Sequence, residues 1–171
     1  RLAGLPPDRD GLNLVVLSDL HLGTLKGKRW LTQLIGRVQD LKPDLVVVAG
    51  DLVDGNVRHV ETVLPTLQQL RAPLGVWAVT GNHEYYAGLA ESVNLLEAAG
   101  YGLLRDRWAE VMPGLIIAGV DDLTAREQFG QPDGAIEKAL ANRPPGGTIL
   151  LSHSPVESHK ASAAGANLML S

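Results

Sequence analysis

The chain has 171 residues, 45% apolar and 20% charged, a composition typical of one ordinary soluble domain with enough chain for a sizeable core. Its 15 basic and 19 acidic residues give a net charge of -4, which offers no electrostatic footprint for general binding to nucleic acids or membrane surfaces. The chain has no cysteine, which excludes disulfides, thiol catalysis and thiolate-bound metals. Any metal ligands must therefore be Asp, Asn, Glu or the five His residues.

Membrane association is not indicated by the residues themselves. No apolar stretch approaches the roughly 18 residues that a membrane-spanning helix needs, and no signal-like leader is present. The chain opens at Arg1 rather than Met, so a membrane anchor is expected only in a segment upstream. The sequence leaves the cellular compartment open.

Apolar strands and amphipathic helices alternate after an irregular lead-in at residues 1–11. Short apolar runs predict strands at 12–17, 45–49, 74–79, 101–104, 110–112, 115–120, 148–151 and 167–170. Apolar residues at helical spacing predict helices at 30–41, 60–70, 89–99 and 135–141. We expect the first strand to be buried on both faces, and Pro65 to kink the second helix or to begin a new one.

This alternation predicts the α/β fold class. Right-handed βαβ units place the strands in a largely parallel sheet with helices covering its faces. No internal repeat or linker interrupts the pattern, so residues 1–171 are interpreted as a single domain. In such folds the ligand sites lie at the carboxyl ends of the strands.

Metal-competent side chains stand directly after four of the predicted strands. They are Asp19 and His21 after the first, Asp51 after the second, Asn82 after the third and His153 after the strand at 148–151. If these strand ends share one edge of the sheet, the five side chains converge there. We expect Gly50 and Gly81 to let the backbone turn tightly as it leaves the strands.

Carboxylate, amide and imidazole ligands suit divalent Mn, Fe, Zn or Ni. One carboxylate, best assigned to Asp51, would bridge two ions. Two ions roughly 3.5–4 Å apart would bind a phosphate oxygen and convert a bridging water to the hydroxide that attacks phosphorus in line. His83 then suits a proton donor to the leaving oxygen, with Glu84 orienting its ring.

Four short motifs occur in order: Asp19-Leu-His21, Gly50-Asp51-Leu-Val-Asp54, Gly81-Asn82-His83-Glu84 and the isolated His153. With these motifs the chain resembles the calcineurin-like metallophosphoesterase superfamily. Leu5-Pro6-Pro7 and the segment LNLVVLSDLHLG at 12–23 resemble its bacterial membrane-linked branch.

The resemblance implies an α/β/β/α sandwich with two divalent metal ions. It implies that Asp19, His21 and Asp51 hold one ion, that Asp51, Asn82 and His153 hold the other, and that His83 donates a proton. It also implies a bacterial protein that is cytoplasmic or associated with a membrane.

The resemblance further implies that a Gly-His-x-His motif and more strands follow a segment like residues 167–171. The chain is therefore expected to be truncated, with one His missing from each ion's ligands. Such a chain would bind metal weakly or incompletely. It would also self-associate through the unpaired edge of its last strand.

The favoured function is hydrolysis of a phosphate mono- or diester, on a small-molecule, lipid-linked or nucleotide substrate. One alternative is a noncatalytic α/β module or inactive truncated remnant that binds a partner or phosphate. Another is a nuclease of the same superfamily, which the balanced charge disfavours.

Other polar and aromatic residues receive structural interpretations. Asp54 is expected to accept a hydrogen bond within its loop, and Asp121 and Asp122 to form a turn. Tyr86, close to His83, would either stack on a leaving group or pack the wall of the site. The three tryptophans, Trp30 among them, are expected in the core.

Overall fold

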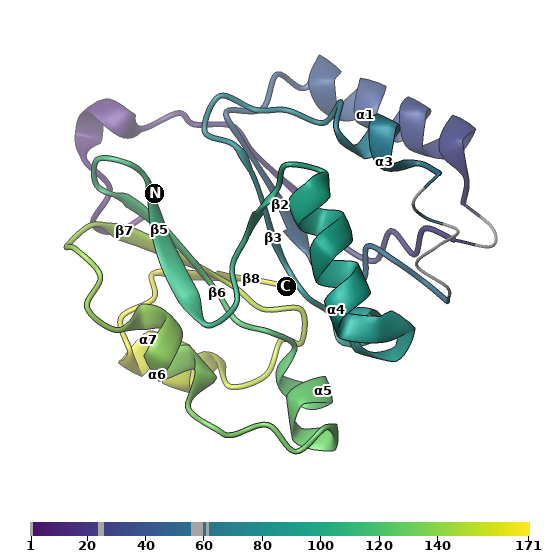
Figure 1. Cartoon of the computed structure of the whole chain (residues 1–171). Coiled ribbons are helices and arrows are strands. Elements are labelled where there is room, and N and C mark those ends of the chain that lie inside the picture. Colours follow the sequence, from purple (N-terminus) through teal and green to yellow (C-terminus); the bar gives the residue numbers. More distant parts are fainter. Residues whose placement is uncertain (1, 24–25, 56–59, 61) are drawn as a thin grey trace.

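The computed structural model describes residues 2–23, 26–55, 60 and 62–171. Two four-stranded sheets pack face to face, with helices on both outer faces (Figure 1). The strand orders are β1-β2-β3-β4 and β5-β6-β7-β8. The predicted α/β class and α/β/β/α sandwich are therefore confirmed.

The first sheet is entirely parallel. Its strands are β1 (Leu14–Leu17), β2 (Leu45–Ala49), β3 (Val76–Val79) and β4 (Gly102–Leu103). The helices that connect them are α1 (Lys28–Asp40), α3 (Leu64–Leu67) and α4 (Asn82–Ala98). These helices lie together on one side of the sheet (Figure 1).

The second sheet begins with an antiparallel hairpin and continues in parallel. Its strands are β5 (Arg107–Met112), β6 (Leu115–Gly119), β7 (Gly147–Leu151) and β8 (Leu168–Leu170). The helices around it are α5 (Leu123–Gln128), α6 (Ala135–Leu140) and α7 (Ser158–Ala163). The lead-in contains one turn of 3₁₀ helix, Pro7–Arg9.

The buried apolar residues form three layers, one between the sheets and one under each set of helices. Successive residues of β2 pack in different apolar layers, because side chains point alternately to the two faces of a strand. Val46 and Val48 pack with the helices of the first sheet, whereas Val47 packs between the sheets with Ile117 of β6. This alternation explains why β2 is a continuous apolar run.

Several predicted elements need correction. β1 is not buried on both faces, because it is an edge strand of the first sheet and Val16 is 39% exposed. Trp30 is not in the core: it is 37% exposed, and the Lys26 ammonium lies 5.1 Å from its ring centroid. Val16 lies on the edge strand and Trp30 in the first turn of α1, and both side chains remain partly open to solvent.

The helices also differ from the predicted ranges. In the predicted range 60–70 the described residues include α3, which has Pro65 in its first turn, while residues 56–59 and 61 lie outside the described residues. α4 begins seven residues before the predicted start at 89, because Gly88 (φ 109°, ψ 103°) separates two helical segments and only the second carries the apolar pattern. Among the described residues, no helix is long and apolar enough to cross a membrane.

Candidate metal centre

The loops that follow β1 and β2 run side by side beyond the ends of the strands. The His21 amide donates to the Asp51 carbonyl at 2.9 Å, and the Asp54 amide donates to the Leu22 carbonyl at 2.8 Å. Leu22 and Val53 form an isolated parallel bridge. These backbone bonds hold the residues of the Asp-x-His and Gly-Asp-x-x-Asp motifs next to one another.

Three candidate ligands have left-handed backbone conformations. The φ angles are 57° at Asp19, 46° at His21 and 51° at Asp51. Residues other than glycine adopt this region rarely, and such strain persists only where the surrounding structure holds it. Strained residues cluster at functional sites, and these three belong to the metal-competent set identified from the sequence.

Two glycines allow the loops to approach closely. Gly50 has φ 91°, and a Cβ there would lie 2.8 Å from the Cβ of His153. A Cβ on Gly81 would lie only 2.1 Å from Oδ1 of Asp51. Gly81 has ordinary φ, so its role is close approach rather than the tight turn expected from the sequence.

Three imidazoles face one buried carboxylate oxygen. Oδ2 of Asp51 lies 3.4 Å from Nε2 of His153, 3.8 Å from Nε2 of His21 and 4.0 Å from Nε2 of His83. Two groups of potential ligand atoms share Asp51, one with His21 and His83, the other with Asp19 and His153. Within each group the ligand atoms lie within 4.8 Å of one another.

The sets implied by the resemblance are also brought together. Nε2 of His21 lies 3.6 Å from Oδ1 of Asp19, and Nε2 of His153 lies 3.1 Å from Oδ1 of Asn82. All five predicted ligands therefore surround a common space. One expectation is corrected: these loops do not share a single sheet edge, because His153 follows β7 of the second sheet.

The hydrogen bonds of His153 test whether a cation fits. Its Nδ1 lies 2.9 Å from the Ala49 carbonyl, which can only accept, so Nδ1 carries a proton. Nε2 faces the oxygens of Asn82 and Asp51, so the space between these atoms requires a positive charge, supplied either by a proton on Nε2 or by a cation. A carbonyl partner behind the ring is typical of metal-binding histidines.

His21 supplies a second sign of fit. Its Nδ1 is buried and has no hydrogen-bond partner, while its Nε2 faces Asp19 and Asp51. The donor set of imidazole, carboxylate and amide oxygen matches divalent Mn, Fe, Zn or Ni. The residues present therefore fit a divalent metal centre.

Charge in the centre is balanced between Asp51 and His153. Burial acts to raise the pKa of Asp51, but hydrogen bonds from His153 and from the His83 amide, at 2.9 Å, outweigh it and lower that pKa. The hydrogen bond to Asp51 raises the pKa of His153 to about 9. Without a cation, a proton on His153 compensates the buried carboxylate.

Asp54, and not Glu84, orients the His83 ring. Oδ1 of Asp54 lies 3.1 Å from Nδ1 of His83. The interpretation of Glu84 as the orienting partner is wrong, because its carboxylate accepts the backbone amides of Asp51, Gly81 and Val53 at 2.6–3.1 Å. The Gly-Asp-x-x-Asp spacing was the signal available for Asp54.

Glu84 is fully buried and ties loops together. Its two oxygens connect the loops after β2 and β3, and its burial raises its pKa. Through the Asp51 amide it fixes the backbone of the carboxylate that the histidines face. Glu84 thus supports the centre without entering it.

Comparison with known proteins places this geometry in a family. The family model described as calcineurin-like phosphoesterase matches residues 12–170. The chain belongs to the calcineurin-like phosphoesterase family. This confirms the resemblance drawn from the four motifs.

Three curated proteins are similar in sequence to this phosphoesterase chain. The chain is 38% identical over 160 residues to a Danio rerio protein named transmembrane protein with metallophosphoesterase domain, covering 88% of this chain and 37% of that protein. It is 40% identical over 117 residues to an uncharacterized metallophosphoesterase of Aquifex aeolicus, covering 68% and 44%. It is 32% identical over 176 residues to the uncharacterized metallophosphoesterase YkuE of Bacillus subtilis, covering 98% and 59%. The chain spans less than two thirds of each relative's length.

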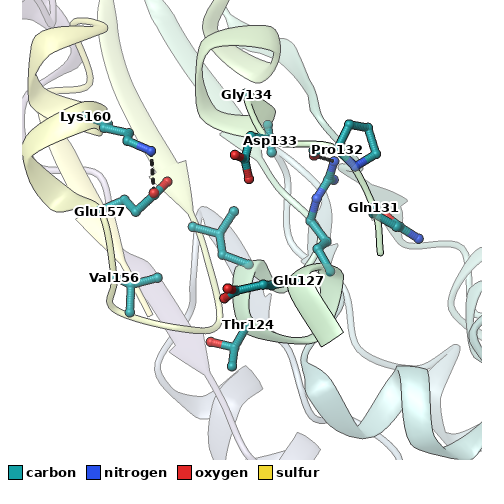
Figure 2. Close-up of a pocket in the computed structure, with 12 residues that line it drawn as sticks. Thr124, Glu127, Gln131, Pro132, Asp133, Gly134, Val156, Glu157 and Lys160 are labelled. Carbon is teal, nitrogen blue, oxygen red and sulfur yellow. Dashed lines mark hydrogen bonds and ion pairs between the residues drawn. The ribbon is translucent and has the colours of Figure 1, made fainter. Parts of the chain in front are cut away.

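The phosphoesterase chain also has a polar cavity of about 260 Å³ between α5, α6 and α7, where Lys160 pairs with Glu157 (Figure 2). Although all seven predicted site residues are described, none of them lines this cavity. Thr124 does line it, and its hydroxyl lies 3.1 Å from the hydroxyl of Ser154, which follows His153. The cavity therefore lies next to the His153 loop.

The acidic pair after β6, expected from the sequence to form a turn, has a bend at Asp121 and the N-cap of α5 at Asp122. Asp122 caps α5 by accepting the Ala125 amide at 2.7 Å. The buried carboxylate of Asp121 forms an ion pair with the partly exposed Arg105 at 2.8 Å and accepts the Thr80 hydroxyl at 2.8 Å. Both carboxylates are thus occupied within the phosphoesterase fold.

Proposed function

We propose that this domain hydrolyses a phosphate mono- or diester with two divalent metal ions held around Asp51. The observation that carries the proposal is the sharing of Asp51 between two groups of ligand atoms. A buried, ionised carboxylate with imidazoles on several sides suits a bridge between two cations. The family to which the chain belongs supports the same chemistry.

Each side chain has one role in this proposal. The two groups of ligand atoms share Asp51 but divide Asp19 and His21 between them. The resemblance to the family assigns Asp19 and His21 to one ion and Asn82 and His153 to the other, and the short distances within each pair support it. When bound, such ions supply positive charge for the phosphate oxygens and lower the pKa of the attacking water. The Ala49 carbonyl keeps the proton of His153 on Nδ1, which leaves Nε2 free to bind metal.

His83 protonates the leaving oxygen. Asp54 accepts a hydrogen bond from Nδ1–H of His83. This contact turns Nε2 of the same ring toward the centre, where the proton on Nε2 is transferred to the leaving oxygen. Because His83 also belongs to one of the two ligand groups, the metal content of His83→Ala distinguishes a proton donor from a ligand.

The substrate proposed is a small-molecule or lipid phosphoester. The net charge of -4 gives no support to a polyanionic substrate such as DNA. Two relatives are named transmembrane proteins with a metallophosphoesterase domain. We extend this to the present protein as the proposal that the domain works beside a membrane.

The test is metal analysis combined with turnover by the full-length encoded protein. We expect nearly two ions per chain, hydrolysis of an aryl phosphate mono- or diester with Mn²⁺, and loss of turnover with a chelator. Undiminished turnover in chelator-treated, metal-free protein would refute the proposal. A noncatalytic binding module would contain no stoichiometric metal, and a nuclease would cleave DNA at low salt.

A further inference from the structure

The His83 ring has three side-chain neighbours of different chemistry. Asp54 meets its Nδ1 at 3.1 Å, and the His21 ring lies edge-on at 4.5 Å between centroids. The third neighbour is Tyr86, whose ring lies 5.7 Å away at an interplanar angle of 64°. Asp54 and His21 are accounted for by the proposed reaction, whereas Tyr86 is not.

Tyr86 is an exposed aromatic that is nevertheless held in place. It is 56% exposed, and its hydroxyl donates to Oε1 of Gln128 on α5 at 3.2 Å. An exposed ring of this size costs hydrophobic free energy that burial would recover. Since the hydroxyl already has a partner, the ring is the part of Tyr86 that remains available to a ligand.

The neighbouring residue provides a contrast. Tyr85 is 7% exposed, packs on Phe129 at 5.3 Å between centroids, and donates to Gln131. Tyr85 therefore accounts for the docking of α4 against α5, where the two helices lie next to each other (Figure 1). The packing of α4 against α5 through Tyr85 does not require the contact between the rings of Tyr86 and His83.

We propose that Tyr86 forms a leaving-group subsite, which selects phosphoesters whose alcohol carries an apolar ring next to the ester oxygen. This inference rests on the proposed function, since it places the leaving oxygen at His83. The first atoms of the alcohol then lie within reach of the aromatic side chain packed against that imidazole. A ring in this position buries the exposed surface of Tyr86, whereas a short alkyl alcohol leaves it in water.

Binding of two phosphonates to the metal-loaded protein tests this subsite. Benzylphosphonate resembles phenyl phosphate and ethylphosphonate resembles methyl phosphate, with a methylene group in place of the leaving oxygen in each. We expect calorimetry to show a preference for the benzyl compound, and Tyr86→Ala to reduce that preference by about three- to tenfold, in line with the strength of an aromatic pair. Tyr86→Phe should retain the preference, because the ring remains.

The control is Phe129→Ala, which removes an equally exposed aromatic (55%) from the same helix junction. Its benzyl preference and metal content should match the unmodified protein. The subsite is refuted if Tyr86→Ala keeps the full preference, or if Phe129→Ala loses as much of it. If neither phosphonate binds to the unmodified, metal-loaded protein, the subsite is refuted as well. The proposed function fails only if aryl phosphate mono- and diesters are both left unhydrolysed, and metal analysis of each variant excludes loss of the centre.

Discussion

At the scale of single residues, the centre requires a carboxylate to stay ionised while almost fully buried. Asp51 is 2% exposed, and the neighbours that lower its pKa are His153 and the amide of His83. These contacts come from the loop after β7 and from the first turn of α4, so the charge of Asp51 depends on the assembled site. The proposed ligand Asp51 and the proposed proton donor His83 are therefore in contact. Their roles are distinguished by substituting each residue in turn.

Substitution of Asp51 and of His83 should have different consequences. Asp51→Ala should lower metal occupancy and rate together, because both ligand groups contain Asp51. His83→Ala should retain metal and lose roughly 10²–10⁴ in rate, the usual contribution of a placed proton donor. Metal analysis and kinetics on the same preparations measure both effects. Equal metal loss in the two variants would show that His83 is a ligand.

The His153–Asp51 pair should make the metal-free protein more stable at lower pH. The pKa of His153 is raised from 6.5 to about 9 by its hydrogen bond to Asp51, so the folded state binds this proton more tightly than the unfolded state. The stabilisation is complete below pH 6.5 and is lost as pH rises toward 9. At 1.36 kcal/mol per pKa unit it amounts to as much as about 3 kcal/mol.

Urea unfolding with a chelator, at several values from pH 6 to pH 9, measures this effect. The free energy of unfolding should fall over that range in the unmodified protein, and should fall less in His153→Ala. His159→Ala is a suitable control, because His159 is exposed on α7. An identical pH dependence in His153→Ala and the unmodified protein would contradict the pairing.

At the scale of elements, the positions at which strands end could be predicted from the sequence more accurately than the side-chain contacts between the loops that follow them. Apolar runs locate β2 and β7, and the polar residues that follow them are the ones the structure brings together. The partner of His83 could not be predicted in this way, because it depends on how the first turn of α4 meets the loop after β2. The helices α5 and α7 could not be predicted, because their six residues include few large apolar side chains, whereas α6, of the same length, has Ala135, Ile136, Ala139 and Leu140 on one face.

Glu84 should matter for the stability of this junction. As the third residue of α4 it accepts the Gly81 amide, and it also accepts the amides of Asp51 and Val53. Glu84→Ala leaves three amides without this acceptor, and each unsatisfied buried donor costs about 1–3 kcal/mol. We expect a loss of about 3 kcal/mol or more in chelator-treated protein.

Chemical denaturation measures the free energy of unfolding of Glu84→Ala and of the control variant Glu97→Ala. Glu97 is exposed on the same helix, so its substitution should change the free energy of unfolding by no more than about 0.5 kcal/mol. If the two variants were equally stable, the carboxylate of Glu84 would not hold the loops together.

At the scale of the whole molecule, the centre joins the two sheets. Asp19, His21, Asp51 and Asn82 follow strands of the first sheet, whereas His153 follows β7 of the second. The apolar pattern of the strands could not assign them to two sheets, because parallel strands buried on both faces read alike in either one. The prediction of two sheets came from the resemblance to the family, which rests on the polar motifs after the strands.

Metal binding should therefore stabilise the packing of one sheet on the other. A ligand at 100 times its dissociation constant adds about 2.7 kcal/mol to the free energy of unfolding, which corresponds to a rise of roughly 5–10 °C in Tm for a chain of this size. His153→Ala removes the ligand from the second sheet and should lose more than half of the Mn²⁺-induced rise, whereas His159→Ala should keep it. Thermal unfolding of the three proteins with Mn²⁺ and with chelator measures the shift. The same rise in His153→Ala would mean that the metal is held by the first sheet alone.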